Sequence, residues 1–151
     1  MRKLTGLLLL GFAVASLATS IAYAEADGSP RVIATYFHGT FRCQTCLHIE
    51  SLARYDVTDV MASDIESGQL IWRSLNFEKE ENARYQEQFK LEGSTLIITL
   101  EDGGEVLKWV QLDRVWDLYD NSDAFDKYVM GTIEEYLIAA SEIAGDNEQP
   151  E

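Results

Sequence analysis

The two cysteines of this 151-residue chain, Cys43 and Cys46, are separated by two residues and are the side chains best suited to chemistry. An apolar, β-branched run at residues 32–37 precedes them, and a helical pattern over about residues 47–65 follows. Cys43 should therefore lie between a strand and a helix, close to the helix N-terminus. Unpaired backbone N–H groups there favour negative charge. They would stabilise the thiolate, which is the nucleophilic form of cysteine.

The cysteine pair has a reactive and a structural interpretation. In the reactive one, Cys43 is the attacking thiolate and Cys46, one helical turn deeper, is the resolving thiol of a Cys43–Cys46 disulfide. In the structural one, the disulfide only stabilises the fold. Because a disulfide that closes so short a loop removes little chain entropy, the reactive interpretation is favoured.

Three neighbours are expected to line the cysteine pair. Arg42 directly precedes Cys43, and its positive charge should favour the thiolate further. Gln44 and Thr45 are the two residues between the cysteines. We therefore expect all three side chains at the mouth of the site.

His38 could carry protons, ligate a metal or serve only as a hydrogen-bonded spacer near the end of the first strand. With His48 and the two cysteines it could form a Cys₂His₂ set for zinc or copper(I), as in a metal- or metalloid-binding module. The spacing of His48 is not that of a known zinc finger, and we assign no metal. We also expect no cofactor, because the chain has no Gly-x-Gly-x-x-Gly motif for a nucleotide or flavin.

Hydrophobic periodicity predicts one α/β domain. Four strands are expected, at residues 32–37, 70–77, 95–100 and 105–112. Four helices are expected, at about residues 47–65, 80–89, 113–119 and 123–144. Asp56 and Thr58 could kink the first helix, Gly145 should end the last, and Asp102-Gly103-Gly104 is a hairpin signal. The order β-α-β-α-β-β-α favours a four-stranded mixed sheet with helices on both faces.

The N-terminal residues have the features of a secretory signal peptide. Arg2 and Lys3 precede an apolar run at residues 4–18, and Ala22-Tyr23-Ala24 has the form of a cleavage site. Cleavage at about Ala24–Glu25 would export the protein to the periplasm or the extracellular space, where two cysteines can pair. The alternative is an uncleaved anchor helix. We expect no stable membrane insertion after cleavage.

The remaining chain is strongly acidic. Without Arg2 and Lys3 it has 10 basic and 26 acidic residues, a net charge of −16 with histidine neutral. Nucleic acid is excluded as a partner, because phosphate binding needs clustered Lys and Arg. We expect a flexible lead-in at residues 25–30, the folded domain at residues 31–144 and an acidic disordered tail at residues 145–151.

This order of elements, with Cys-x-x-Cys between the first strand and the first helix, resembles the thioredoxin fold. More narrowly, YFHGTFRCQTC (residues 36–46) and LDRVW (residues 112–116) resemble small thioredoxin-like proteins of the nitrophenyl compound nitroreductase subunit (ArsF-type) family. The resemblance implies a thiol-disulfide oxidoreductase whose partners are protein thiols or disulfides. It also leaves open a non-catalytic subunit that docks on a larger redox enzyme.

The sequence departs from the thioredoxin pattern in three ways, one of which is Arg42 before Cys43, where thioredoxins commonly have tryptophan. Thioredoxins place a cis-proline opposite the disulfide, and the matching position here is Ser94–Thr95, so these two residues are expected to line the site. The only prolines after the signal peptide are Pro30 and Pro150. Thioredoxins also bury an acid in the first strand, and this strand has none.

Overall fold

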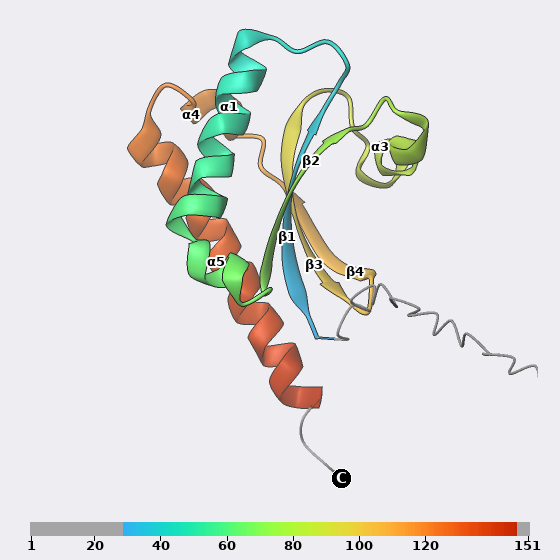
Figure 1. Cartoon of the computed structure of the whole chain (residues 1–151), viewed down its shortest axis with the longest axis vertical. Helices are drawn as coiled ribbons and strands as arrows, with labels where there is room; N and C mark the ends of the chain where they lie inside the picture. The colour runs from blue at the N-terminus through green and yellow to red at the C-terminus, as the bar shows by residue number, and fades with distance from the viewer. Residues whose placement is uncertain (1–28, 148–151) are drawn as a thin grey trace, which may run out of the picture.

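Strand β1 (Arg31–His38) lies inside a four-stranded sheet, which explains why its residues 32–37 are all buried. The computed structural model describes residues 29–147 (Figure 1). The other strands are β2 (Leu70–Asn76), β3 (Thr95–Asp102) and β4 (Glu105–Gln111). The strand order is β2-β1-β3-β4, with β2 parallel to β1 and the other neighbouring pairs antiparallel. The predicted mixed sheet is therefore confirmed.

The first predicted helix is three consecutive segments. It begins earlier than expected, as α1 (Gln44–Tyr55), and continues as the π-helical η1 (Asp56–Val60) and as α2 (Ala62–Glu66). The Met61 N–H donates to the Asp56 carbonyl at 3.0 Å, which is the i→i+5 bond of a π turn. The expected kink near Asp56 is thus a π segment, and Gly68 follows the last segment with a φ of +79°.

Helices cover both faces of the sheet, as predicted, but unequally (Figure 1). The helices α1 and α5 (Ser122–Asn147) cover one face and bury a large apolar core that includes Tyr36, Ile49 and Phe125. The 3₁₀ turn η2 (Glu80–Asn82) and the helix α3 (Ala83–Phe89) cover part of the other face. A smaller cluster lies there, made of Phe37, Phe77, Phe89, Leu91 and Ile97.

The β3–β4 hairpin follows the sequence signal, because Gly103 and Gly104 both have positive φ, as a type I′ turn requires. The short helix before α5 is α4 (Val115–Leu118).

The last helix extends further than expected. α5 continues through Gly145 to Asn147, so the predicted helix end was wrong by three residues. One exposed glycine costs a helix only about 1 kcal/mol, which does not end a helix of this length. The predicted signal peptide at residues 1–24, residues 25–28 of the lead-in and residues 148–151 of the tail lie outside the described residues. Within residues 29–147, no helix is both long enough and apolar enough to cross a membrane.

Candidate functional site

Cys43 and Cys46 form a disulfide at the start of α1, with Cys43 as the N-cap residue. The Cys43 backbone is extended (φ −82°, ψ 161°), and its Sγ accepts a hydrogen bond from the Cys46 N–H at 3.0 Å. This is the bond that a capping serine or aspartate would accept from the N3 amide. Cys43 is exposed, whereas only 8% of Cys46 is accessible.

The same arrangement favours negative charge on the Cys43 sulfur after reduction. The N-terminal end of α1 presents unpaired N–H groups to this sulfur, and its first turn contains no acidic residue. Gln44 and Thr45 complete that first turn between the cysteines, Gln44 exposed and Thr45 half-buried. The exposed sulfur is therefore also the one at which a thiolate is stabilised.

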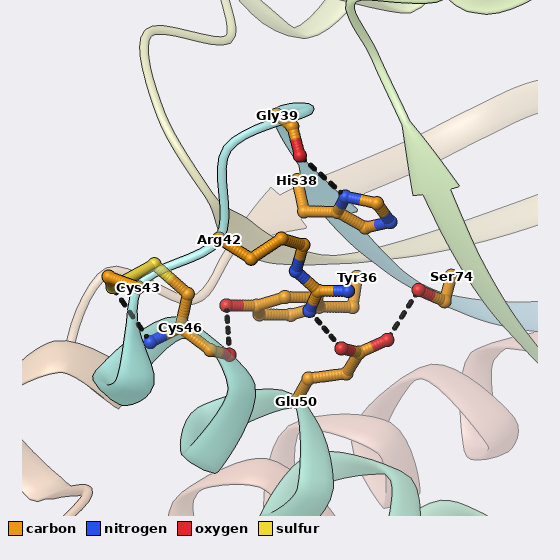
Figure 2. A network of polar contacts seen from close by, with 8 residues as sticks. All are labelled: Tyr36, His38, Gly39, Arg42, Cys43, Cys46, Glu50 and Ser74. Atoms are coloured by element: carbon orange, nitrogen blue, oxygen red, sulfur yellow. Dashed lines mark hydrogen bonds and ion pairs between the residues drawn. A yellow bond between two sulfur atoms is a disulfide. The ribbon is translucent and has the colours of Figure 1, made fainter.

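Tyr36 lies beside the disulfide, with its hydroxyl directed toward the backbone of Cys46 (Figure 2). Its hydroxyl donates to the Cys46 carbonyl at 2.9 Å. The Ser94 side chain lies within hydrogen-bonding reach of the same hydroxyl. Burial raises the pKa of Tyr36 to about 12, so this phenol is neutral and does not act as a base at neutral pH.

Arg42 does not present a free charge to Cys43, in contrast to the expectation from sequence. Its Nη2 forms an ion pair with Glu50 Oε2, and its guanidinium lies over the Tyr36 ring, 6.0 Å from the centroid. Ser74 Oγ donates to the other Glu50 oxygen. Burial alone would raise the pKa of Glu50, but the bonds from Ser74 and Arg42 outweigh it and hold the pKa below its usual value.

Contacts from the end of β2 brace the loop that leads to Cys43. Glu78 Oε2 accepts from the Thr40 backbone N–H at 2.8 Å, and Asn76 Nδ2 donates to Thr40 Oγ1 at 3.0 Å. The hydrogen bonds from Thr40 lower the pKa of Glu78. A Cβ at Gly39 would come within 2.8 Å of the Glu78 carboxylate, so a larger residue there would displace the Glu78 side chain.

The two histidines both contact backbone carbonyls. His38 Nδ1 lies 2.9 Å from the Gly39 carbonyl, and His48 Nε2 lies 3.2 Å from the Tyr119 carbonyl. Because a carbonyl only accepts, each of these nitrogens carries its proton. Across residues 29–147, no three His, Cys, Asp or Glu side chains are grouped to hold a metal.

Ser94 and Thr95, the two residues that were expected to line the site from the other side, differ in their surroundings. The Ser94 carbonyl accepts from the Trp116 indole N–H at 3.0 Å, and its side chain lies next to Tyr36. Thr95 is buried opposite Phe37 in the β1–β3 register, and its hydroxyl has no partner among the described residues. No peptide bond in the described chain is cis.

Several residues of the site were missed by sequence reasoning, namely Tyr36, Glu50, Ser74 and Trp116. Glu50 follows Cys46 by four residues, which places both on one side of α1 and was a usable signal. Ser74 lies opposite Tyr36 in the β1–β2 pairing, a register that the sequence alone does not specify. Trp116 contacts Ser94 because of the path that the chain takes after β4, which the sequence alone does not specify.

Large apolar side chains are exposed near the disulfide. Phe41, two residues before Cys43, is 92% accessible, and Leu47, next to Cys46, is 43% accessible. Trp116, which contacts the Ser94 loop, is 37% accessible. When such groups lie together on a surface, they are typical of sites that contact other proteins.

No family model matches the chain, and no curated protein matches it. Among solved structures it is similar to Fasciola hepatica thioredoxin, at 14% identity and a TM-score of 0.41, over 72% of this chain and 84% of that one. It is also similar to thioredoxin O2 from Arabidopsis thaliana in the oxidised state, at 11% identity and a TM-score of 0.35, over 66% and 77% of the two chains.

The topology defines the class of protein. A parallel β1–β2 pair joined through α1, an antiparallel β3–β4 hairpin on the other side of β1, and a Cys-x-x-Cys disulfide at the β1–α1 junction make up a thioredoxin-like fold.

Proposed function

We propose that this chain is an exported thiol-disulfide oxidoreductase that exchanges its Cys43–Cys46 disulfide with cysteines of protein partners. One observation supports this most strongly: the exposed sulfur of the pair is the N-cap of α1, and the second sulfur lies buried behind it. A disulfide that served only to stabilise the fold would not need one sulfur exposed at the position where a thiolate is favoured.

In the reducing direction, the Cys43 thiolate attacks one sulfur of a partner disulfide and releases the other partner sulfur as a thiolate. The Cys46 sulfur then attacks Cys43 Sγ, the Cys43–Cys46 disulfide forms again, and the second partner sulfur leaves. Two electrons pass from the dithiol to the partner, and the leaving thiolate takes up the proton of Cys46. The oxidising direction is the reverse sequence.

The exposed apolar side chains around the disulfide support a protein as the partner rather than a small thiol. Phe41, Leu47 and Trp116 would contact the segment that carries the reacting cysteine. The partner is a protein with a thiol or disulfide or, as the resemblance to the nitrophenyl compound nitroreductase subunit family implies, one larger redox enzyme. Fractionation of cells that express the full chain tests the export that the N-terminal segment predicts.

The test of this function is the reduction of insulin disulfides with dithiothreitol as the electron source. The wild-type chain should accelerate insulin precipitation, and Cys43→Ser should reduce the rate to that of dithiothreitol alone, because no attacking thiolate remains. Ser51→Ala, on the exposed side of α1, is the matched control and should keep full activity. A wild-type rate no higher than that of Cys43→Ser would refute the proposal.

A further inference from the structure

The side chain of Arg42, which directly precedes the exposed cysteine, is directed away from the disulfide (Figure 2). It extends over the Tyr36 ring to the carboxylate of Glu50 on α1. Only 22% of the Arg42 side chain and 17% of the Glu50 side chain are accessible. An arginine next to a reactive cysteine would otherwise be free to stabilise the thiolate.

Glu50 is held from a second side. Ser74 on β2 donates to the Glu50 oxygen that Arg42 does not use. In contrast, the buried Nε of Arg42 has no hydrogen-bond partner among the described residues. Among residues 29–147, Glu50 is therefore the one hydrogen-bonding partner of the guanidinium, which also lies over the Tyr36 ring, and Ser74 of the sheet holds Glu50.

We propose that Glu50 is a positioning residue that holds Arg42 away from Cys43. In doing so it makes the Cys43 thiol less acidic than it would be with Arg42 free to approach it. The Cys43–Cys46 disulfide is, for the same reason, harder to reduce. This inference depends on the proposed function, since it describes how the exchanging cysteine pair is tuned.

Arg42 and Glu50 together carry no net charge, so the N-terminal end of α1 is the main group that favours a Cys43 thiolate. Without the Glu50 charge, Arg42 is released and can approach Cys43, which it adjoins in the chain. A nearby cation stabilises the thiolate, lowers the thiol pKa and so stabilises the reduced protein relative to the disulfide.

The test is Glu50→Gln, with the Cys43 pKa and the redox equilibrium with glutathione as readouts. The pKa should fall, and the equilibrium constant should shift about fivefold toward the reduced protein, which is about 20 mV. Glu66→Gln removes the same charge from an exposed site on α2 and should leave both values unchanged. Ser74→Ala, which loosens Glu50 without removing charge, should give a smaller shift of the same sign.

A second comparison separates positioning from a direct effect of the Glu50 charge. If Glu50 acts through Arg42, the shift caused by Glu50→Gln should largely disappear in an Arg42→Met background. An equal shift in that background, or no shift of Glu50→Gln beyond the Glu66→Gln control, would overturn the inference.

The pKa of Cys43 can be followed by the pH dependence of its alkylation, which does not need disulfide exchange with a partner. A chain that fails to reduce insulin but shows the predicted alkylation shift would refute the proposed function and leave the Arg42–Glu50 coupling intact. Active wild-type protein without the shift would refute only the coupling.

Discussion

The Asp56→Asn variant should be more stable than the wild-type chain at about pH 8, by up to about 4 kcal/mol, and should lose this advantage near pH 4. Asp56 is the first residue of the π segment and is completely buried. Neither of its carboxylate oxygens receives a hydrogen bond from a donor among the described residues. Ionisation of this group in the folded protein is therefore costly.

Burial, and in second place the carboxylate of Asp126 on α5, raise the pKa of Asp56 from 3.8 to about 7. No cation contributes to this shift. Because the folded pKa exceeds the unfolded one, the folded chain retains a proton that the unfolded chain releases. The resulting stability is fully present below about pH 4 and is lost as the pH rises through about 7. Asparagine stays neutral, so the Asp56→Asn variant does not lose this stability as the pH rises.

Urea unfolding of the oxidised protein at several pH values measures this effect as the difference between variant and wild type. Taking the difference removes the opposite contributions of Glu50 and Glu78, whose lowered pKa values stabilise the fold at higher pH. Asp59→Asn, at an exposed position of the same π segment, is the control and should follow the wild type. Parallel pH profiles of Asp56→Asn and wild type would show that Asp56 ionises normally.

The two cysteines of the reduced protein should differ in reactivity by at least about tenfold. Cys43 is exposed and lies at the helix N-terminus, whereas Cys46 is buried behind it over Tyr36. An alkylating reagent in substoichiometric amount should therefore modify Cys43 almost alone, which peptide mapping can quantify.

The same asymmetry predicts the behaviour of two trapping variants. Cys46→Ser should form a long-lived mixed disulfide with reacting proteins, because the residue that would release the partner is gone. Cys43→Ser should form little mixed disulfide under the same conditions. Equal trapping by both variants, or faster alkylation of Cys46, would reverse the roles assigned to the two sulfurs.

The parts of this structure that depend on local sequence were predictable. The buried strand before the cysteines follows from a run of apolar residues, and the β3–β4 hairpin follows from Gly103 and Gly104, which tolerate positive φ. The position of Cys43 at the start of a helix follows from the periodicity that begins just after it. Each of these inferences needs only neighbouring residues.

The parts that depend on tertiary contacts were not predictable. Arg42 appeared free in the sequence, since no acidic residue lies between Arg31 and Glu50, but α1 folds Glu50 back onto it. Glu78 is far from Thr40 in sequence and reaches it only because β2 runs parallel to β1. The acidic residues closest to the site are thus set by strand register and by the side of α1 that faces the sheet.

The reduction potential of the Cys43–Cys46 pair tests the central claim most directly, because it separates an exchanging disulfide from one that only stabilises the fold. It is measured by equilibrating the protein with glutathione mixtures and quantifying the reduced form. Stabilisation of the Cys43 thiolate by the N-terminus of α1 predicts a value above about −270 mV, less reducing than thioredoxin. A value below about −300 mV, the range of structural disulfides, would contradict the assignment of this site to thiol-disulfide exchange.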